Sequence, residues 1–482
     1  MSKNINQILQ EKYPHLEVSV LKLSEVKKNI DFRIDDSFWT MKLIYNNKLN
    51  YKKIGECLLK SQYGISINMN EGGDGVPIYR MNDIDNMLCN FEVKKYALID
   101  KNELQTFRLN YGDVLFNRTN SYEFVGRTGI FYNNRENFVF ASYLVRLVCN
   151  KEILLPEYLT VFLNTHIGKK EIRRRARPSI NQTNVNPEEL KEIKIPILPI
   201  EFQLEIEKMV KDSHKALEES KELYKKAEET LYLELGLDPK NPLQSLLDSK
   251  TNNPTKSLNI SIHTLKESFL KTGRLDSEYC QSKYEDIEKM IRSYKDGFCN
   301  LKDLVNDISS GFAFSSDDYQ DVGELVLIRI NNIKNATLDL SNVIYLKNEA
   351  YNLSPKDKIK KGDILISMSG SIGLSCVVRD DISAMVNQRI LKISIKNFNS
   401  DVLVLLLNSF ICKMQFERIG TGGVQTNLSS IDMQNILIPK IDSTTQEKIA
   451  KYIQESFNLR KKSKQLLDNA KIKVEEQIQG KV

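Results

Sequence analysis

The chain has 482 residues, enough for two or three domains, and its 41% hydrophobic and 27% charged residues are ordinary for a globular protein. The net charge of +6 is a mild bias toward an anionic partner, and the seven irregularly spaced cysteines exclude a zinc knuckle. The N-terminus has no apolar segment, and no run reaches the roughly 18–20 apolar residues that span a membrane. We therefore expect a cytoplasmic protein with reduced cysteines and no membrane contact.

Residues 1–200 are expected to form a mixed α/β domain. From about residue 30, short runs of β-branched and aromatic residues alternate with Gly, Asn and Asp turns, and a short helix is predicted from Pro156 to Leu163. The Gly112-Asp113 turn leads into a buried strand. Small polar residues after such a strand suit close approach to a ligand, and they equally suit a tight turn. The residues of this first polar loop that we regard as candidate DNA contacts are Asn117, Arg118 and Asn120.

A basic run lies near the end of this domain. Clustered arginines neutralise DNA phosphates and release counterions. The polar residues that follow, Gln182 and Asn184 among them, can reach sugar, phosphate or base edges. The alternative is a solvated helix end followed by a capped turn. We expect DNA contact from the six cations found in nine residues, namely Lys169, Lys170, Arg173, Arg174, Arg175 and Arg177, and weakly from Gln182.

A long helix is predicted after Ile195–Pro199, a segment whose prolines prevent a continuous helix. Residues 201–235 contain neither Gly nor Pro, and their apolar side chains recur every three or four positions, opposite a face of Lys and Glu. We assign this spacer helix to residues 201–237. The following stretch, 238–260, is rich in Pro, Asn, Ser and Lys and is expected to be a linker.

The second half of the chain repeats the motifs of the first, in the same order and at an offset of about 241–250 residues. The repetition predicts a second domain at 261–440 and a second long helix at 441–482. The second polar loop supplies the candidates Ser367, Ser369 and Ser371, and Gln425 is the equivalent of Gln182. The matched motifs are Arg33-Ile34-Asp35 with Arg274-Leu275-Asp276, Gly112-Asp113 with Gly362-Asp363, Gln182-Thr183-Asn184 with Gln425-Thr426-Asn427, Ile195-Pro196 with Ile438-Pro439, and Gln203 with Gln446.

These elements predict an α+β fold with two duplicated mixed α/β domains, each followed by a long helix. A helix of about 35 residues is roughly 50 Å long, and its apolar face needs a partner. We expect the two helices to pair as an antiparallel coiled coil. The alternative is that each helix packs only on its own domain.

The sequence contains no recognisable catalytic motif. Amino-group methyltransferases need Pro-Pro followed by an aromatic residue, and the chain contains no Pro-Pro. It has no G-x-x-x-x-G-K-[ST] phosphate-binding loop of the ATPase type. Its four histidines are scattered, and neither His166 nor His214 has a Cys or carboxylate partner at ligand spacing. We therefore expect no catalytic residue, no metal and no cofactor. The glycine turn at 420–423 can approach a phosphate, but a plain loop explains it as well.

The chain resembles the specificity subunit of type I restriction–modification systems, and the resemblance covers nearly its whole length. The residues that carry it are the segment 361–367, the Gln-Thr-Asn motifs, and Pro439 with Gln446–Ala450. The first copy departs from the pattern, since no Ala follows Ile206.

The resemblance implies a non-catalytic subunit whose two target-recognition domains read a split, asymmetric site in double-stranded DNA. It also implies two bound methyltransferase subunits that modify adenine with S-adenosylmethionine, and restriction/translocase subunits as optional further partners. Because the two domains differ in sequence, their half-sites should differ, and the helix pair should hold the domains a fixed distance apart. Two alternatives remain: a two-domain coiled-coil scaffold that binds protein instead of DNA, and an enzyme with an unrecognised centre.

Overall fold

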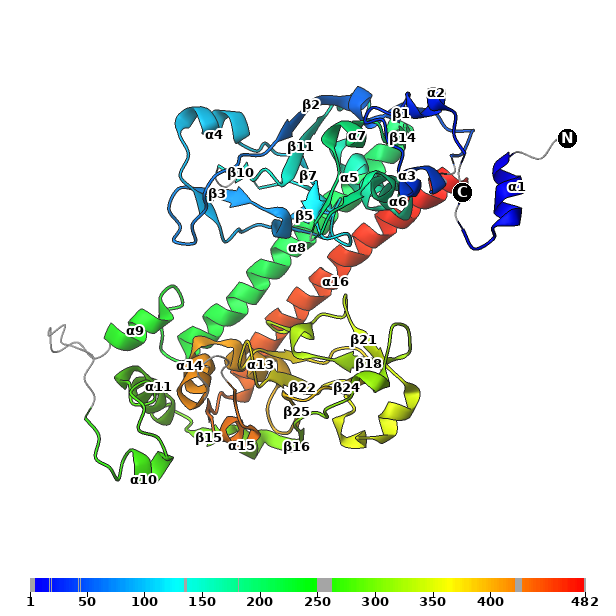
Figure 1. Cartoon of the computed structure of the whole chain (residues 1–482). Coiled ribbons are helices and arrows are strands. Elements are labelled where there is room, and N and C mark those ends of the chain that lie inside the picture. The colour runs from blue at the N-terminus through cyan, green and yellow to red at the C-terminus, as the bar shows by residue number, and fades with distance from the viewer. Residues whose placement is uncertain are drawn as a thin grey trace. The chain divides into compact units, whose positions relative to one another are not determined.

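The computed structural model describes residues 5–16, 18, 20–41, 43, 45–133, 137–180, 182–248, 262–420 and 427–480 (Figure 1). The chain divides into two compact units, one made of residues 1–218 with 459–482 and the other of residues 219–458. The boundary crosses both long helices, so each unit holds one mixed α/β domain and one half of each helix. Within the described ranges, no helix combines the length and the apolar character that a membrane crossing requires.

The first unit is built around a six-stranded sheet with the order β2-β11-β7-β9-β5-β4. Its strands are β2 (Leu58–Tyr63), β4 (Ile84–Asp85), β5 (Leu88–Cys89), β7 (Val114–Asn117), β9 (Thr128–Ile130) and β11 (Leu144–Cys149). Strand β7 is buried along its length, which agrees with the buried strand expected after the Gly112-Asp113 turn. Two helices in tandem, α5 (Pro156–Asn164) and α6 (His166–Arg175), follow β11, and α5 contacts β9.

Smaller elements complete this unit. The three-stranded sheets have the orders β10-β3-β6 and β12-β13-β8, and β1 pairs with β14. Their strands are β1 (Tyr51–Lys53), β3 (Val76–Tyr79), β6 (Tyr96–Ala97), β8 (Thr119–Asn120), β10 (Val139–Phe140), β12 (Arg177–Pro178), β13 (Thr183–Asn184) and β14 (Lys194–Pro196). The short helices are α1 (Ile5–Lys12), α2 (Leu23–Val26), α3 (Asp36–Thr40), α4 (Lys101–Phe107) and α7 (Pro187–Lys191).

The second unit has two four-stranded sheets with the orders β16-β25-β22-β23 and β17-β21-β18-β24, and two strand pairs, β15-β26 and β19-β20. Its strands are β15 (Phe298–Asn300), β16 (Val305–Ser309), β17 (Tyr319–Gln320), β18 (Leu325–Ile328), β19 (Ile333–Lys334), β20 (Thr337–Leu338), β21 (Ile344–Leu346), β22 (Ile364–Ser367), β23 (Ser375–Val377), β24 (Ala384–Val386), β25 (Ile390–Ile395) and β26 (Leu437–Pro439). Its helices, apart from the long ones, are α9 (Pro242–Asp248), α10 (Phe269–Thr272), α11 (Ser282–Arg292), α12 (Leu301–Leu304), α13 (Ser400–Asn408), α14 (Phe410–Ile419) and α15 (Ser430–Gln434).

The two units share one topology, which confirms the duplication predicted from the repeated motifs. The antiparallel strand order β2-β11-β7-β9 of the first unit recurs as β16-β25-β22-β23 in the second. A parallel pair, β3 with β10, recurs as β18 with β24. The tandem helices α5 and α6 recur as α13 and α14.

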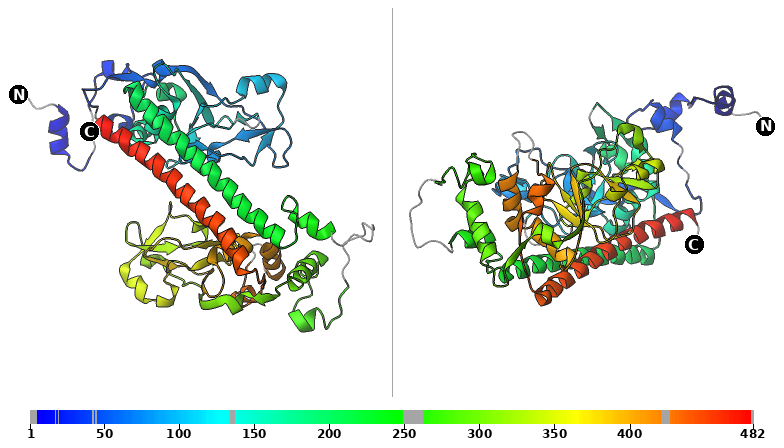
Figure 2. Two further views of the ribbon diagram at one scale, coloured as in Figure 1. Left: turned by 180° about the vertical axis from the view of Figure 1, so that it is seen from behind. Right: turned by 90° about the horizontal axis from the view of Figure 1, so that it is seen from below.

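The long helices are α8 (Ile200–Glu234) and α16 (Ser443–Gln479). Within each unit, the halves of α8 and α16 that belong to it lie side by side (Figure 2). In the first unit the hydroxyls of Ser213 and Ser463 lie 2.8 Å apart, and in the second those of Ser220 and Ser456 lie 3.1 Å apart. From Ser213 to Ser220 the position on α8 moves seven residues forward, whereas the partner on α16 moves seven residues backward, from Ser463 to Ser456. The pairing is therefore antiparallel, as predicted.

Each helix half also packs on the domain of its unit. Ile206 and Val210 of α8, with Val474 of α16, join the apolar core of the first unit. Leu231 of α8 and Ile453 of α16 join that of the second. Each long helix therefore packs both on the other long helix and on the α/β domain of the unit, and its apolar face serves both contacts.

Candidate nucleic-acid interface

The basic run of the first unit forms helix α6 and the strand after it. Thr165 caps the N-terminus of the helix, since its hydroxyl accepts a hydrogen bond from the amide of Gly168 at 3.0 Å, and Ala176 is the C-cap. Strand β13 then pairs with β8, the strand of the first polar loop. The structure thus brings together the polar loop, the cationic helix and the Gln-Thr-Asn motif, three features that lie far apart in the sequence.

Three of the four arginines have partners within the unit. Arg175 is buried and forms an ion pair with Glu171. The Nε of Arg174 donates to the carbonyl of Phe38 at 2.6 Å, and its guanidinium lies 4.4 Å from the centre of the Phe38 ring. Arg177 forms ion pairs with Asp31 and Glu189. The contacts of Arg174 with Phe38 and of Arg177 with Asp31 attach the end of α6 and the strand after it to the N-terminal segment.

The exposed cations of α6 itself are Lys169 and Arg173. Arg173 is exposed, and its guanidinium lies 5.7 Å from the ring centre of Tyr122, which is itself 50% exposed. Lys169 is exposed, although part of its side chain is covered. This partial burial, together with the positive charges of Lys471, Arg173 and Arg127, lowers the pKa of its ammonium group. Lys170 is half-buried. Neighbouring like charges of this kind produce a local positive potential that favours an anionic partner.

The candidates of the first polar loop differ in exposure. Asn117 is buried, and its side-chain amide donates weakly to the carbonyl of Phe124 at 3.5 Å. Arg118 is half-buried, and its guanidinium lies 5.1 Å from the Tyr63 ring centre. Asn120 is half-buried and accepts a hydrogen bond from the amide of Ser121. Gln182, in the turn between β12 and β13, is exposed.

The second unit has the same arrangement. Ser369, in its polar loop, forms an antiparallel bridge with Asn427, as β8 does with Asn184 in the first unit. Ser367 and Ser369 are buried, and the hydroxyl of Ser367 donates to the carbonyl of Ser369 at 2.8 Å, whereas Ser371 is exposed. Gln425 lies outside the described residues. In both units the Asn of the Gln-Thr-Asn motif therefore holds the loop to the domain.

Comparison with known proteins identifies the family. The family model described as "Type I restriction modification DNA specificity domain" matches residues 57–229 and 297–469. The chain belongs to this family. Each matched segment includes one mixed α/β domain and most of the long helix that follows it.

Individual relatives match over shorter stretches. The chain is 31% identical to the putative type I restriction enzyme MjaX specificity subunit of Methanocaldococcus jannaschii over 151 residues. The matched stretch is 31% of this chain and 35% of that protein. The chain is 27% identical over 165 residues to the EcoKI specificity subunit of Escherichia coli K12, covering 34% and 35%. The chain thus spans about a third of the length of these relatives. Among solved structures, the type I S subunit from M. genitalium matches with a TM-score of 0.42 and 14% identity, over 90% of this chain and 96% of that one.

One repeated motif of this specificity-domain chain has a structural role that the sequence did not reveal. Arg33 forms an ion pair with Asp35 and donates to the carbonyl of Arg175 at 2.9 Å. Arg274 forms the same pair with Asp276 and donates to the carbonyl of Ile419, at the end of α14, at 3.4 Å. The Arg274 hydrogen bond lowers the pKa of Asp276 to about 2. The repetition of Arg-x-Asp was the available signal, but its partners lie more than 140 residues away.

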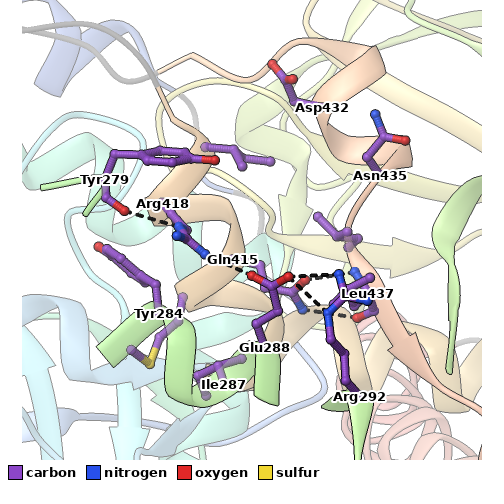
Figure 3. A pocket seen from close by; sticks show the side chains of 13 residues that line it. Tyr279, Tyr284, Ile287, Glu288, Arg292, Gln415, Arg418, Asp432, Asn435 and Leu437 are labelled. Carbon is purple, nitrogen blue, oxygen red and sulfur yellow. Dashed lines mark hydrogen bonds and ion pairs between the residues drawn. The ribbon is translucent and has the colours of Figure 1, made fainter. Parts of the chain in front are cut away.

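The second unit contains a cavity of about 390 Å³ between α11, α14 and α15 (Figure 3). Arg418 crosses it, with its guanidinium 4.7 Å from the Tyr279 ring centre and its Nη1 3.0 Å from Glu288. Its Nε donates to the carbonyl of Tyr279, just as Arg174 donates to Phe38. Arg292 also pairs with Glu288. The cavity therefore holds an internal ion-pair network, and no group of three His, Cys, Asp or Glu side chains suited to a metal occurs among the described residues.

Proposed function

We propose that this chain is the DNA-reading subunit of a type I restriction–modification complex, in which each domain reads one half of a split, asymmetric DNA site. The observation that carries the proposal is the presence of two specificity domains with one topology and different sequences. A repeated frame with different surface residues is suited to two different half-sites.

In this proposal the subunit makes no covalent change to DNA. It positions two methyltransferase subunits, which bring S-adenosylmethionine to adenine, and restriction/translocase subunits are optional further partners. The absence of Pro-Pro and of a nucleotide-phosphate loop in the sequence supports a non-catalytic role.

The proposed phosphate contact of the first unit is the exposed Lys169, with Lys170 beside it, and Arg173 is the exposed arginine of α6 that we propose to face the DNA. For Arg174, Arg175 and Arg177 the internal ion pairs and hydrogen bonds favour a structural role instead. Asn120, Gln182 and Ser371 are the polar candidates with surface exposure. The burial of Asn117, Ser367 and Ser369 favours a role in shaping the loops.

The deciding experiment maps methylated adenines in the DNA of the host cell, with and without the gene for this chain. The expected result is one bipartite methylated motif that disappears when the chain is removed. Purified chain should also bind a duplex carrying that motif, with an affinity that falls steeply as salt rises. A methylation pattern that does not depend on the chain would overturn the proposal.

A further inference from the structure

The polar loops of the two units share a backbone frame. In the first unit the amide of Gly126 donates to the carbonyl of Asn117 at 2.8 Å, and in the second the amide of Gly373 donates to that of Ser367 at 2.8 Å. The next residue in each loop makes backbone hydrogen bonds to two other segments. In the first unit the amide of Arg118 donates to the carbonyl of Tyr143, and its carbonyl accepts from the amide of Val185. In the second unit the amide of Met368 donates to the carbonyl of Arg389, and its carbonyl accepts from the amide of Leu428. The same bonds thus enclose both loops.

The closing glycine brings each loop against a helix of its own unit, α6 in the first and α14 in the second. Gly126 has φ +84° and Gly373 has φ +76°, a conformation that favours glycine. A Cβ atom would lie 2.6 Å from Ile172 of α6 at the first position and 2.1 Å from Phe416 of α14 at the second. Ile172 and Phe416 are therefore equivalent, and a side chain at either glycine would push the loop off the helix.

Inside this common frame the two loops differ. Residues 119–125 lie between Arg118 and the closing glycine in the first unit, whereas only residues 369–372 occupy that place in the second, so the first loop is three residues longer. The exposed residues of the longer loop include Tyr122 and Glu123, and those of the shorter loop are Gly370 and Ser371.

The adjacent helix position differs as well. The residue after Ile172 is Arg173, whereas the residue after Phe416 is Glu417, and both are exposed. Four residues earlier, by contrast, both helices carry a lysine, Lys169 and Lys413. The lysine shared by both helices suits the phosphate backbone, which is the same in any DNA sequence. The opposite charges of Arg173 and Glu417, each beside a loop of different length, suit base edges, which differ between the two half-sites.

We propose that the loop closed by Gly126, together with Arg173, determines which bases the first domain reads, and that the loop closed by Gly373, together with Glu417, does so in the second. The inference rests on the proposed DNA-reading function and adds the residues responsible. Arg173 can donate to guanine, Glu417 can accept from the amino group of cytosine, and Tyr122 offers an aromatic face with a hydroxyl.

The test maps methylated adenines in host cells that express variants of the full chain with its native partners. Arg173→Glu should change one half of the bipartite motif and Glu417→Arg should change the other. Tyr122→Ala should change the same half as Arg173→Glu, with a loss of discrimination of about 5- to 150-fold at the affected bases. Lys94→Glu, the same charge reversal at an exposed residue of the first unit, should leave both halves intact.

The outcomes separate this inference from the proposed function. If the wild-type chain directs no bipartite motif, the proposed function fails. If the wild type does so but Arg173→Glu, Glu417→Arg and Tyr122→Ala all retain both halves, the proposed function stands and the loop inference is overturned. Should a charge reversal abolish methylation altogether, Tyr122→Ala decides, because removing an exposed side chain preserves the frame.

Discussion

At the scale of single residues, the sequence located the basic run but not the orientation of its side chains. Arg177 pairs with Asp31 and Arg174 donates to Phe38, and both partners lie about 140 residues earlier in the chain. A helix end rich in arginine has the same composition whether its charges face solvent or an N-terminal segment. Composition therefore could not distinguish Arg173, which is exposed, from Arg175, which is buried.

Opposite effects are expected from removing these two arginines. Arg173→Ala should weaken DNA binding and leave stability nearly unchanged, because an exposed side chain that we propose to contact DNA is lost. Arg175→Ala should lower the free energy of unfolding by on the order of 3 kcal/mol, because Glu171 would remain buried without its cation. Urea denaturation and DNA binding at several salt concentrations would test this. A stable Arg175→Ala protein that binds DNA less tightly than wild type would reverse the two roles.

The Arg274–Asp276 pair should make the second unit sensitive to acid. Because the pKa of Asp276 is lowered to about 2 in the folded chain, the pair stabilises the fold fully above the ordinary carboxyl pKa of about 3.9. That contribution should disappear as the pH falls from about 4 to 2. In Asp276→Asn the melting temperature should be lower than wild type at pH 7 and converge with it at low pH. A constant difference across this range would exclude the mechanism.

At the scale of elements, the long helices were predictable because apolar spacing over about 35 residues leaves few alternatives. The repeated Gln203 and Gln446 were visible but their role was not. Each side chain accepts from a backbone amide at the start of a domain helix, Leu155 or Asn399, and donates to the carbonyl before its own long helix, Leu198 or Ile441. Such a bridge depends on tertiary contacts, which spacing alone does not reveal.

The buried serines of the helix pair should tolerate only small residues. Ser220→Leu should lower the free energy of unfolding by about 1–3 kcal/mol, because Ser220 faces Ser456 across a close interface with no room for a branched side chain. Glu222→Leu places the same residue on the exposed face of α8 and should change stability by less than about 0.5 kcal/mol. Chemical denaturation measures both. Equal effects of the two variants would argue against close packing at the serines.

At the scale of the whole molecule, the duplication followed from motif order, since five matched motifs at a nearly constant offset require two copies of one topology. The domain limits of 1–200 and 261–440 stay a prediction, because each compact unit combines a domain with halves of both helices. Short-range sequence signals mark where a helix begins, but they do not show that its two halves join different cores.

The two domains should act together on one duplex. Tethering two binding modules raises overall affinity by about 10²–10⁴-fold over either module when both can engage. We therefore expect the full chain to bind a duplex containing both half-sites at least about 100-fold more tightly than duplexes in which either half is scrambled. Fluorescence anisotropy at a single fixed salt concentration would measure this, because phosphate contacts make affinity depend on salt. Equal affinity for the three duplexes would show that only charge is recognised, whereas loss on scrambling one half alone would leave the other domain without a DNA-reading role.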